Sequence, residues 1–244
     1  MPRPRSPAAS ALAALALASA APAVAQHAGH APGASHAPAS HAEEMNQRWL
    51  APDLDAAAWA RRFEDPGRDV IANREAIVTA LGLRPGQAVA DVGAGTGAFL
   101  GALARAVGPE GRVYAVDISP GFAAFMAERA AREGLANVTV ILGRADDPTL
   151  PPAALDAVLT VNTFHHFEAP EAMLGHLRRA LKPGGQLVVV DFDPARRRAG
   201  QGAGMDALDK ASLVRLVEAH GFRLAEDVPL PTLRENHMLR FTRR

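Results

Sequence analysis

Short apolar runs alternate with longer stretches of helical hydrophobic periodicity in the chain from Gly86 onward. The runs predict strands over Ala88–Val92, Val113–Val116, Val138–Leu142, Ala157–Val161 and Leu187–Val190. The stretches around them predict helices near Ala98–Val107, Pro120–Arg132, Pro170–Leu181 and Asp206–His220. Because the strands are continuously apolar and separated by helices, they predict an α/β fold with a parallel sheet covered on both faces.

Two further apolar runs, Phe222–Val228 and His237–Thr242, follow each other without a helix between them. A turn that contains proline joins the two runs. They therefore predict an antiparallel hairpin at the edge of a mostly parallel sheet.

The segment ahead of the sheet has the signals of two helices. Asp53 or Asp55 is suited to cap a first helix that runs through Phe63. Asp69 is suited to cap a second helix that runs to Leu81, where a glycine follows. These helices predict a helical cap that precedes the sheet domain.

Trp49, Trp59 and Phe63 form an aromatic set in this N-terminal helical cap, residues 49–84. One interpretation is that the rings pack the cap helices against the sheet domain. The other is that they form a lid over a ligand cleft and contact the substrate. The sequence favours packing and leaves the lid open.

Residues 1–25 have the pattern of a secretory signal peptide. Arg3 and Arg5 precede the apolar run Ala11–Ala21, and Ala23-Val24-Ala25 has the small-x-small form of a cleavage site. Cleavage after Ala25 predicts a periplasmic or secreted protein. The apolar run is too short to span a bilayer, so we expect no stable membrane anchor. Translation from Met45 would instead give a cytoplasmic protein.

Residues 26–48 are rich in Ala, Pro and His and predict a disordered linker. The histidines of this segment are His27, His30, His36 and His41. They could bind a transition metal weakly, although nothing preorganises them as ligands. The alternative, which the sequence favours, is a soluble tether whose histidines have no role.

Composition excludes several kinds of chemistry. The chain has no cysteine, so disulfides, thiolate metal sites and cysteine nucleophiles are absent. Its 26 basic and 26 acidic residues give a formal net charge of zero. No overall field attracts nucleic acid, and no long basic stripe is present. We expect no nucleic-acid partner and no metal in the catalytic site.

The segment Asp91-Val92-Gly93-Ala94-Gly95-Thr96-Gly97 joins the first predicted strand to a helix. Glycine adopts positive φ and has no Cβ, so a ligand can lie against the main chain there. The helix start adds unpaired N–H groups suited to a carboxylate or a phosphate. A carboxylate two residues before the first glycine would repel a pyrophosphate, so Asp91 favours a ligand with a cationic end.

Asp117 closes the second predicted strand, 24 residues after Gly93. One βαβ unit brings a carboxylate at that distance beside the glycine loop, where it can accept both hydroxyls of a ribose. The alternative is that Asp117 caps the helix that follows Ser119.

These motifs resemble the class I S-adenosylmethionine-dependent methyltransferase family, and the resemblance covers residues 85–244. The glycine segment matches the first motif of that family, and Asp117 matches its ribose-binding acid. Leu155-Asp156-Ala157-Val158 and Leu181-Lys182-Pro183-Gly184-Gly185 resemble the beginnings of its fourth and fifth strands. The resemblance implies a Rossmann-like, doubly wound sheet of seven strands with an antiparallel last strand. It also implies S-adenosyl-L-methionine as the cofactor.

The expected cofactor-binding residues are Asp91, Gly93, Ala94, Gly95, Gly97, Asp117, Ile118, Asp146 and Asn162. Asp91 suits the ammonium and sulfonium end of the cofactor, and the resemblance places Asn162 beside its methionine. Asp146 is the candidate for the adenine amino group. Asp147, or simple helix capping, is its alternative.

The resemblance places the acceptor pocket after the fourth strand, in Val161–Phe167. His165 or His166 could take a proton from the acceptor, because imidazole titrates near neutral pH. Asp191 and Asp193, after the fifth strand, are comparable candidates. The alternative is that these histidines only pack against the next helix.

We therefore expect a methyltransferase that acts on a small-molecule acceptor by in-line displacement. One rival is an NAD(P)-dependent oxidoreductase, since the glycine pattern and Asp117 would also suit a dinucleotide. Against it, the single tyrosine, Tyr114, lies within a strand and has no lysine four residues later. The second rival is an exported, non-catalytic protein that binds a ligand or a metal on a methyltransferase scaffold. S-adenosylmethionine is a cytoplasmic metabolite, whereas the N-terminal segment predicts an exported chain. A non-catalytic exported protein would remove that conflict.

Overall fold

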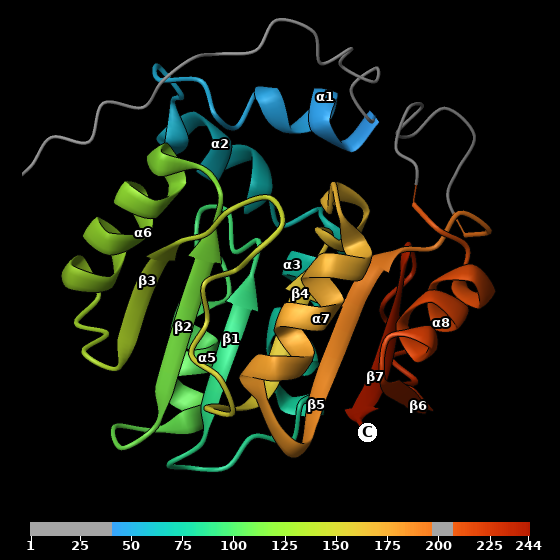
Figure 1. Cartoon of the computed structure of the whole chain (residues 1–244). Helices are drawn as coiled ribbons and strands as arrows, with labels where there is room; N and C mark the ends of the chain where they lie inside the picture. Colours follow the sequence, from blue (N-terminus) through green and yellow to red (C-terminus); the bar gives the residue numbers. More distant parts are fainter. Residues whose placement is uncertain (1–40, 197–206) are drawn as a thin grey trace, which may run out of the picture. The chain divides into compact units, whose positions relative to one another are not determined.

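One sheet of seven strands organises the computed structural model, which describes residues 41–196 and 207–244 (Figure 1). Its strands are β1 (Ala88–Val92), β2 (Arg112–Asp117), β3 (Val138–Leu142), β4 (Leu155–Val161), β5 (Leu181–Phe192), β6 (Phe222–Asp227) and β7 (Asn236–Arg243). Their order is β3-β2-β1-β4-β5-β7-β6. The first five strands in this order, β3, β2, β1, β4 and β5, pair in parallel. Strand β7 is antiparallel to both β5 and β6. The predicted Rossmann-like fold with its antiparallel C-terminal hairpin is confirmed.

Helices cover both faces of this sheet. They are α3 (Asp69–Ala72), α4 (Arg74–Ala80), α5 (Leu100–Val107), α6 (Pro120–Arg132), α7 (Pro170–Ala180) and α8 (Lys210–Ala219). Side chains alternate along each strand, so the sheet supplies two cores. Val89 packs with α3 to α6, whereas its neighbour Ala90 packs with α7 and α8. The sequence showed nearly continuous apolar strands because both faces are buried.

Strand β5 is longer than predicted. It begins at Leu181 instead of Leu187, so the predicted last helix residue, Leu181, belongs to the strand. Leu181 is fully buried and pairs with Leu155, after which the register shifts before Ala157. Pairing across that irregularity extends the strand through a segment that local pattern predicts as a turn.

Two predicted helices begin differently. Asp55 caps the first helix, accepting a hydrogen bond from Ala58 N–H over 2.8 Å, as predicted. Asp69 is not a cap. Its carboxylate accepts the backbone N–H groups of Arg234 (3.0 Å) and Glu235 (2.7 Å), which ties α3 to the hairpin loop. The predicted single helix from Asp69 to Leu81 is also divided in two, because Asn73 separates α3 from α4.

Helix α8 begins at Lys210, and Asp209 caps it by accepting from Ser212 N–H over 2.9 Å. The predicted start at Asp206 lies outside the described residues, and residues 207–209 are not helical.

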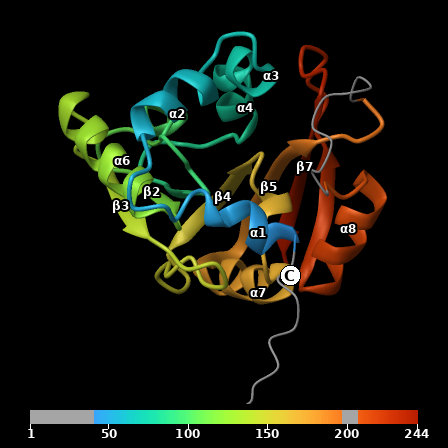
Figure 2. The ribbon, with the colours of Figure 1, turned by 90° about the horizontal axis from the view of Figure 1, so that it is seen from above.

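Helices α1 (His41–Gln47) and α2 (Ala56–Phe63) lie over the carboxyl ends of the strands (Figure 2). We call residues 41–68 the cap. The predicted cap, 49–84, thus divides: α2 covers the strand ends, whereas α3 and α4 pack into one core. No helix in the described part of the chain is long and apolar enough to cross a membrane.

The predicted linker, 26–48, is wrong for its last residues, which form α1. Met45 and Asn46 are buried. Asn46 Nδ2 donates to the carbonyl of His166 (3.0 Å) and to Glu168 (2.9 Å), so long-range contacts hold a segment whose local composition predicted disorder. Residues 1–40, with the predicted signal peptide and most of the linker histidines, lie outside the described part.

Glu64, at the end of α2, fastens the cap to the sheet domain. Its carboxylate accepts two hydrogen bonds from Arg129 (2.7 and 2.6 Å) and one from the hydroxyl of Thr96 (2.9 Å). Burial alone would raise the pKa of Glu64, but the hydrogen bonds from Arg129 and Thr96 outweigh it and lower the pKa. Such a bidentate, charge-assisted pair is stronger than an exposed ion pair.

Replacing Glu64 with alanine should loosen the cap, because Arg129 and the Thr96 hydroxyl then lose this partner. We expect unfolding to cost about 1–3 kcal/mol less. Both tryptophans of the chain, Trp49 and Trp59, lie in the cap, so acrylamide quenching of tryptophan fluorescence should increase. In the control, Glu75→Ala, the lost partners are Arg105 and Arg74, both in exposed ion pairs with Glu75, and neither quantity should change measurably. Unchanged quenching in Glu64→Ala would show that this contact does not hold the cap.

Candidate active site

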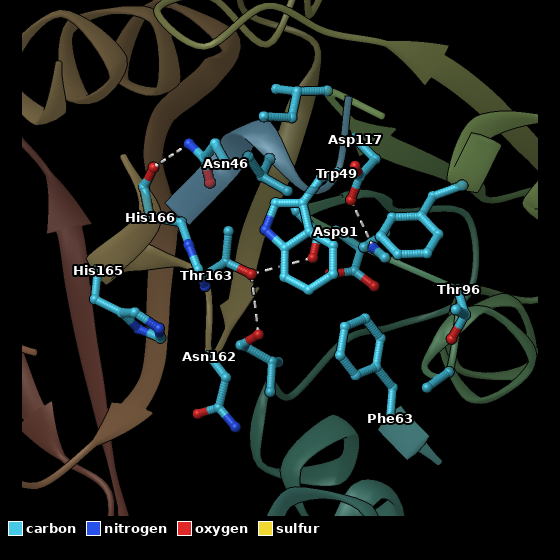
Figure 3. Close-up of a pocket in the computed structure, with 18 of the residues that line it drawn as sticks. Asn46, Trp49, Phe63, Asp91, Thr96, Asp117, Asn162, Thr163, His165 and His166 are labelled. Carbon is cyan, nitrogen blue, oxygen red and sulfur yellow. Dashed lines mark hydrogen bonds between the residues drawn. The ribbon is translucent and has the colours of Figure 1, made fainter. Parts of the chain in front are cut away.

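A cavity of about 1050 Å³ lies between the cap and the carboxyl ends of β1, β2, β4 and β5. In doubly wound sheets, ligands bind at this edge. His165 and His166 lie on one side of the cavity and Asp117 on the other, with Asp91 between them (Figure 3). The fold thus brings most of the predicted site residues to one cavity.

The glycine loop after β1 forms the floor of this cavity. Gly93, Gly95 and Gly97 all have positive φ, at 74°, 56° and 79°. A Cβ on Gly93 would lie 2.0 Å from the Thr163 methyl carbon, so only glycine permits this contact between β1 and the loop after β4. The Thr163 hydroxyl donates to the Gly93 carbonyl over 3.1 Å and strengthens the contact.

Gly97, predicted to bind cofactor, does not line the cavity. A Cβ at Gly97 would lie 2.7 Å from Leu100 Cδ1, and Met126 is also close. The absence of a side chain at Gly97 therefore serves the packing of α5 and α6. By contrast, Gly93, Ala94 and Gly95 do line the cavity, as predicted.

Asp117 lies at the end of β2 with both carboxylate oxygens directed to backbone groups. Oδ2 accepts Gly95 N–H over 2.7 Å, and Oδ1 accepts Ser119 N–H over 2.9 Å. Burial raises the pKa of Asp117 to about 6, although these hydrogen bonds oppose the rise. Helix α6 is capped by Ser119 and not by Asp117, which removes the alternative role weighed for Asp117.

Asp91 is buried at the end of β1, and its Oδ2 has no hydrogen-bond partner within the described residues. Burial raises the pKa of Asp91 to about 7, and the nearby charge of Asp117 adds to the rise. A buried carboxylate without a partner is costly, and in a cavity it indicates a site for a cationic group.

Residues that follow β2 and β3 also line the cavity: Ile118 after β2, and Arg144 and Ala145 after β3. Asp146, the predicted adenine contact, is not at the cavity: its side chain is 63% exposed and lies 3.5 Å from Arg144. Asp147 accepts a hydrogen bond from Thr149 N–H over 2.7 Å and forms an ion pair with Arg144. Both carboxylates thus serve the loop after β3, and the structure does not support adenine recognition by Asp146.

Asn162 lines the cavity at the end of β4 with a positive φ of 50°. Such backbone is strained for most residues but tolerated by asparagine. The Asn162 side chain accepts a hydrogen bond from Asn236 on β7. Asn236 was not predicted, because its link to Asn162 spans 74 residues and has no local signal in the sequence.

His165 and Asp191 form a buried pair beside the cavity. His165 Nδ1 lies 2.8 Å from Asp191 Oδ1, and the backbone N–H of His165 donates to Asp191 Oδ2 over 3.1 Å. Because a carboxylate accepts, the Nδ1 proton lies in this hydrogen bond and Nε2 is left as an acceptor. Nε2 is buried and has no partner within the described residues.

His166 lies against His165, with ring centroids 4.3 Å apart, and against Trp49 at 6.3 Å. Burial lowers the pKa of His166 to about 4, and the charge of His165 contributes. His166 is therefore neutral near pH 7. Asp193 does not line the cavity; it pairs with Arg196 at 3.0 Å.

An aromatic cluster covers the cavity: Trp49, Trp59 and Phe63 from the cap and Phe122 from α6. Trp49 contacts the other three, with ring centroids 4.7 to 5.7 Å apart. The predicted aromatic set thus both packs the cap and lines the ligand cavity. Within the described ranges, no group of three or more His, Asp or Glu side chains could hold a metal ion.

Comparisons with known proteins agree with this geometry. Residues 89–185 match the model of a family described as a methyltransferase domain. The chain is similar to the solved structure of a SAM-dependent methyltransferase from Aquifex aeolicus. That similarity has a TM-score of 0.70 and 25% identity, and it covers 79% of this chain and 100% of the other.

Two curated relatives are also similar. One is a ubiquinone/menaquinone biosynthesis C-methyltransferase of Hydrogenovibrio crunogenus, 35% identical over 46% of this chain and 44% of the relative. The other is nocamycin O-methyltransferase of Saccharothrix syringae, 36% identical over 43% and 37%. The chain thus spans less than half the length of these relatives. Together the findings support a class I methyltransferase and imply S-adenosylmethionine as its cofactor.

Replacing Asp91 with asparagine should stabilise the protein above neutral pH. The folded-state pKa of Asp91 is raised from 3.8 to about 7, so its contribution to stability is lost as pH rises through that range. The neutral variant escapes this loss. We expect its Tm to exceed that of the native chain at pH 8, by about 2–4 °C for each kcal/mol relieved, and the gain to shrink toward pH 4.

The matched control is Asp156→Asn. Asp156 is partly buried, but hydrogen bonds from Ala88 N–H and Lys182 outweigh burial and lower its pKa. That variant should lose Tm at pH 8. A destabilised Asp91→Asn variant at pH 8 would contradict the assignment of Asp91 as a strained, ligand-directed carboxylate.

Proposed function

We propose that this chain transfers a methyl group from S-adenosylmethionine to a small organic acceptor that carries an ionisable O–H, N–H or S–H group. One observation carries the proposal. One cavity is lined on one side by two buried carboxylates and a glycine loop, and on the other by His165, whose ring is paired with Asp191 and whose buried Nε2 has no partner within the described residues.

The residues present fit the cofactor. Asp117 is suited to the ribose hydroxyls, since its oxygens keep lone pairs beyond the backbone hydrogen bonds that they accept. Asp91 supplies negative charge for the ammonium and sulfonium groups, which explains why a buried carboxylate has an oxygen without a partner. Gly93, Ala94 and Gly95 line the cavity, where their main chain would lie against the amino-acid tail. A pyrophosphate would meet two buried carboxylates, which disfavours a dinucleotide.

When bound, S-adenosylmethionine supplies an electrophilic methyl group on a positively charged sulfur. Asp91 and Asn162, at the ends of β1 and β4, would hold its methionine end in the cavity that the two histidines also line. Thr163 donates a hydrogen bond to the Gly93 carbonyl and so ties the glycine loop to the segment after β4. Holding donor and acceptor in line for displacement can contribute roughly 7–11 kcal/mol to catalysis.

His165 acts as the base in this proposal. Asp191 holds the ring through Nδ1, which leaves Nε2 as the ring nitrogen that can accept the proton of the acceptor. The bond between the methyl carbon and sulfur would break as the acceptor atom bonds to that carbon, with S-adenosylhomocysteine as the leaving group. The proton of the acceptor would pass to Nε2, and Asp191 would stabilise the resulting imidazolium. His166 is neutral and adjacent, and it serves as a wall of the acceptor pocket.

The acceptor side of the cavity is apolar. Trp49, Phe167, Met173 and Phe192 line it around the two histidines. This lining supports a small organic acceptor, and the two curated relatives carry the names of enzymes for such molecules.

The sequence of residues 1–25 supports export of the chain.

The first test is calorimetric titration with S-adenosylhomocysteine. We expect the native chain to bind it and Asp117→Asn to bind at least tenfold more weakly, because the ribose loses a charged partner. The control Asp227→Asn changes a carboxylate on β6, paired with Lys210, and should leave binding unchanged. Native protein that binds NADH instead would contradict the proposed function.

The second test concerns the base. With methyl-labelled S-adenosylmethionine and a panel of phenols, catechols, amines and thiols, His165→Gln should lower kcat about 10²- to 10⁴-fold. Its affinity for S-adenosylhomocysteine should stay within threefold. His176→Gln, on the outer side of α7, should keep full activity. A His165→Gln enzyme with native kcat would remove His165 from the chemistry.

A further inference from the structure

Arg68, in the loop between α2 and α3, lines the cavity with its charge uncompensated at close range. No Asp or Glu oxygen in the described part of the chain lies within 4.0 Å of its guanidinium. Asp65 and Glu235 are its acidic neighbours at longer range, and Arg62 is a basic one. Burial lowers the pKa of Arg68, and the charge of Arg62 contributes, so the environment disfavours the cation as the structure stands.

The other arginines that line the cavity are differently placed. Arg144 forms an ion pair with Asp147 at 2.9 Å, within the loop after β3. Arg48 and Arg62 are exposed and lie over the rings of Trp49 and Trp59. Arg68 is the partly buried one among the four arginines that line the cavity.

Phe63 places Arg68 near the glycine loop. The Arg68 guanidinium carbon lies 5.5 Å from the centroid of the Phe63 ring. An atom of the same ring lies 3.6 Å from where a Cβ of Gly95 would be. The cation and the loop therefore flank one aromatic ring, at the end of the cavity to which the cofactor's amino-acid tail is assigned.

The charges of the proposed cofactor call for such a residue. Its sulfonium and ammonium groups are cationic and suit Asp91, but its α-carboxylate is an anion in a cavity that already holds two buried carboxylates. Without a cation, that carboxylate would be repelled. A guanidinium pairs with a carboxylate in a bidentate geometry.

We propose that Arg68 binds the α-carboxylate of the cofactor's amino-acid tail and so connects the cap to the bound cofactor. This inference rests on the proposed function. Arg68 Nη1 donates to the carbonyl of Phe63, the last residue of α2, over 2.8 Å. One N–H group thus holds the end of the cap helix, and the other donors of the guanidinium remain for the ligand.

The competing explanation is that Arg68 only caps the C-terminal end of α2, as basic residues often do. Substitution would then weaken the cap and reduce the affinity for every ligand of the cavity. A carboxylate-binding residue acts differently, because its loss affects only ligands that carry the carboxylate.

Calorimetry with S-adenosylmethionine and its decarboxylated analogue separates the two explanations. The analogue keeps the adenosine, sulfonium and ammonium groups and lacks only the carboxylate. We expect the native chain to favour S-adenosylmethionine about 10- to 100-fold. In Arg68→Gln this preference should fall to about one, through weaker binding of S-adenosylmethionine with affinity for the analogue within threefold of native. Arg68→Lys should keep part of the preference.

The control is Arg61→Gln, which removes an exposed arginine of α2 that does not line the cavity and should leave the preference unchanged. Equal losses for both ligands in Arg68→Gln would overturn the inference in favour of helix capping. An unchanged preference would overturn it in favour of the amides at the start of α5. A native chain that binds neither ligand would contradict the proposed function, and this inference with it.

Discussion

Two carboxylates, Asp91 and Asp117, lie buried at the ends of neighbouring parallel strands, and the rest of the site follows from that constraint. Parallel pairing of β1 with β2 puts Asp91 opposite Ala115, two residues before Asp117. Both carboxyl pKa values are raised mainly by burial. A fold selected for stability alone would not keep this arrangement, since each buried charge costs free energy. The two side chains therefore support the proposed ligand, which offers cationic and hydroxyl groups.

The surrounding elements complete that environment from distant parts of the chain. The glycine loop admits a ligand to the floor, and Thr163 holds the loop against the end of β4. The cap closes the cavity from above and is held by Glu64 at one end and Asn46 at the other. His165 is oriented by Asp191 on the next strand. The residues proposed for cofactor binding and acceptor activation thus lie at one edge of the sheet, and residues of the cap line the same cavity.

Much of this arrangement was accessible from the sequence because it is local. The bounds of β1, β3 and α6 follow directly from apolar runs and a Ser-Pro helix start. The ends of neighbouring parallel strands must meet, so the convergence of Asp91 and Asp117 could also be predicted. The pairing of His165 with Asp191 was not predicted, but His165 follows β4 and Asp191 lies near the end of β5, and these two strands lie side by side in the sheet.

The remaining features depend on contacts between residues far apart in the chain, for which a single sequence holds no signal. Glu64 meets Arg129 across 65 positions, and Asn46 meets Glu168 across 122. Helix α1 was not predicted because the segment was read as a linker, and the burial of Met45 and Asn46 with the hydrogen bonds of Asn46 comes from tertiary contacts. Asp146 was misplaced because the loop after β3 turns its carboxylate to Arg144 and away from the cavity.

The most direct test of the central claim is a crystal structure of the protein with S-adenosylhomocysteine. The account predicts ribose hydroxyls on the Asp117 carboxylate, the ammonium group near Asp91, and the sulfur directed toward His165. A complex in which the compound lies elsewhere while these two carboxylates remain without a ligand would contradict it.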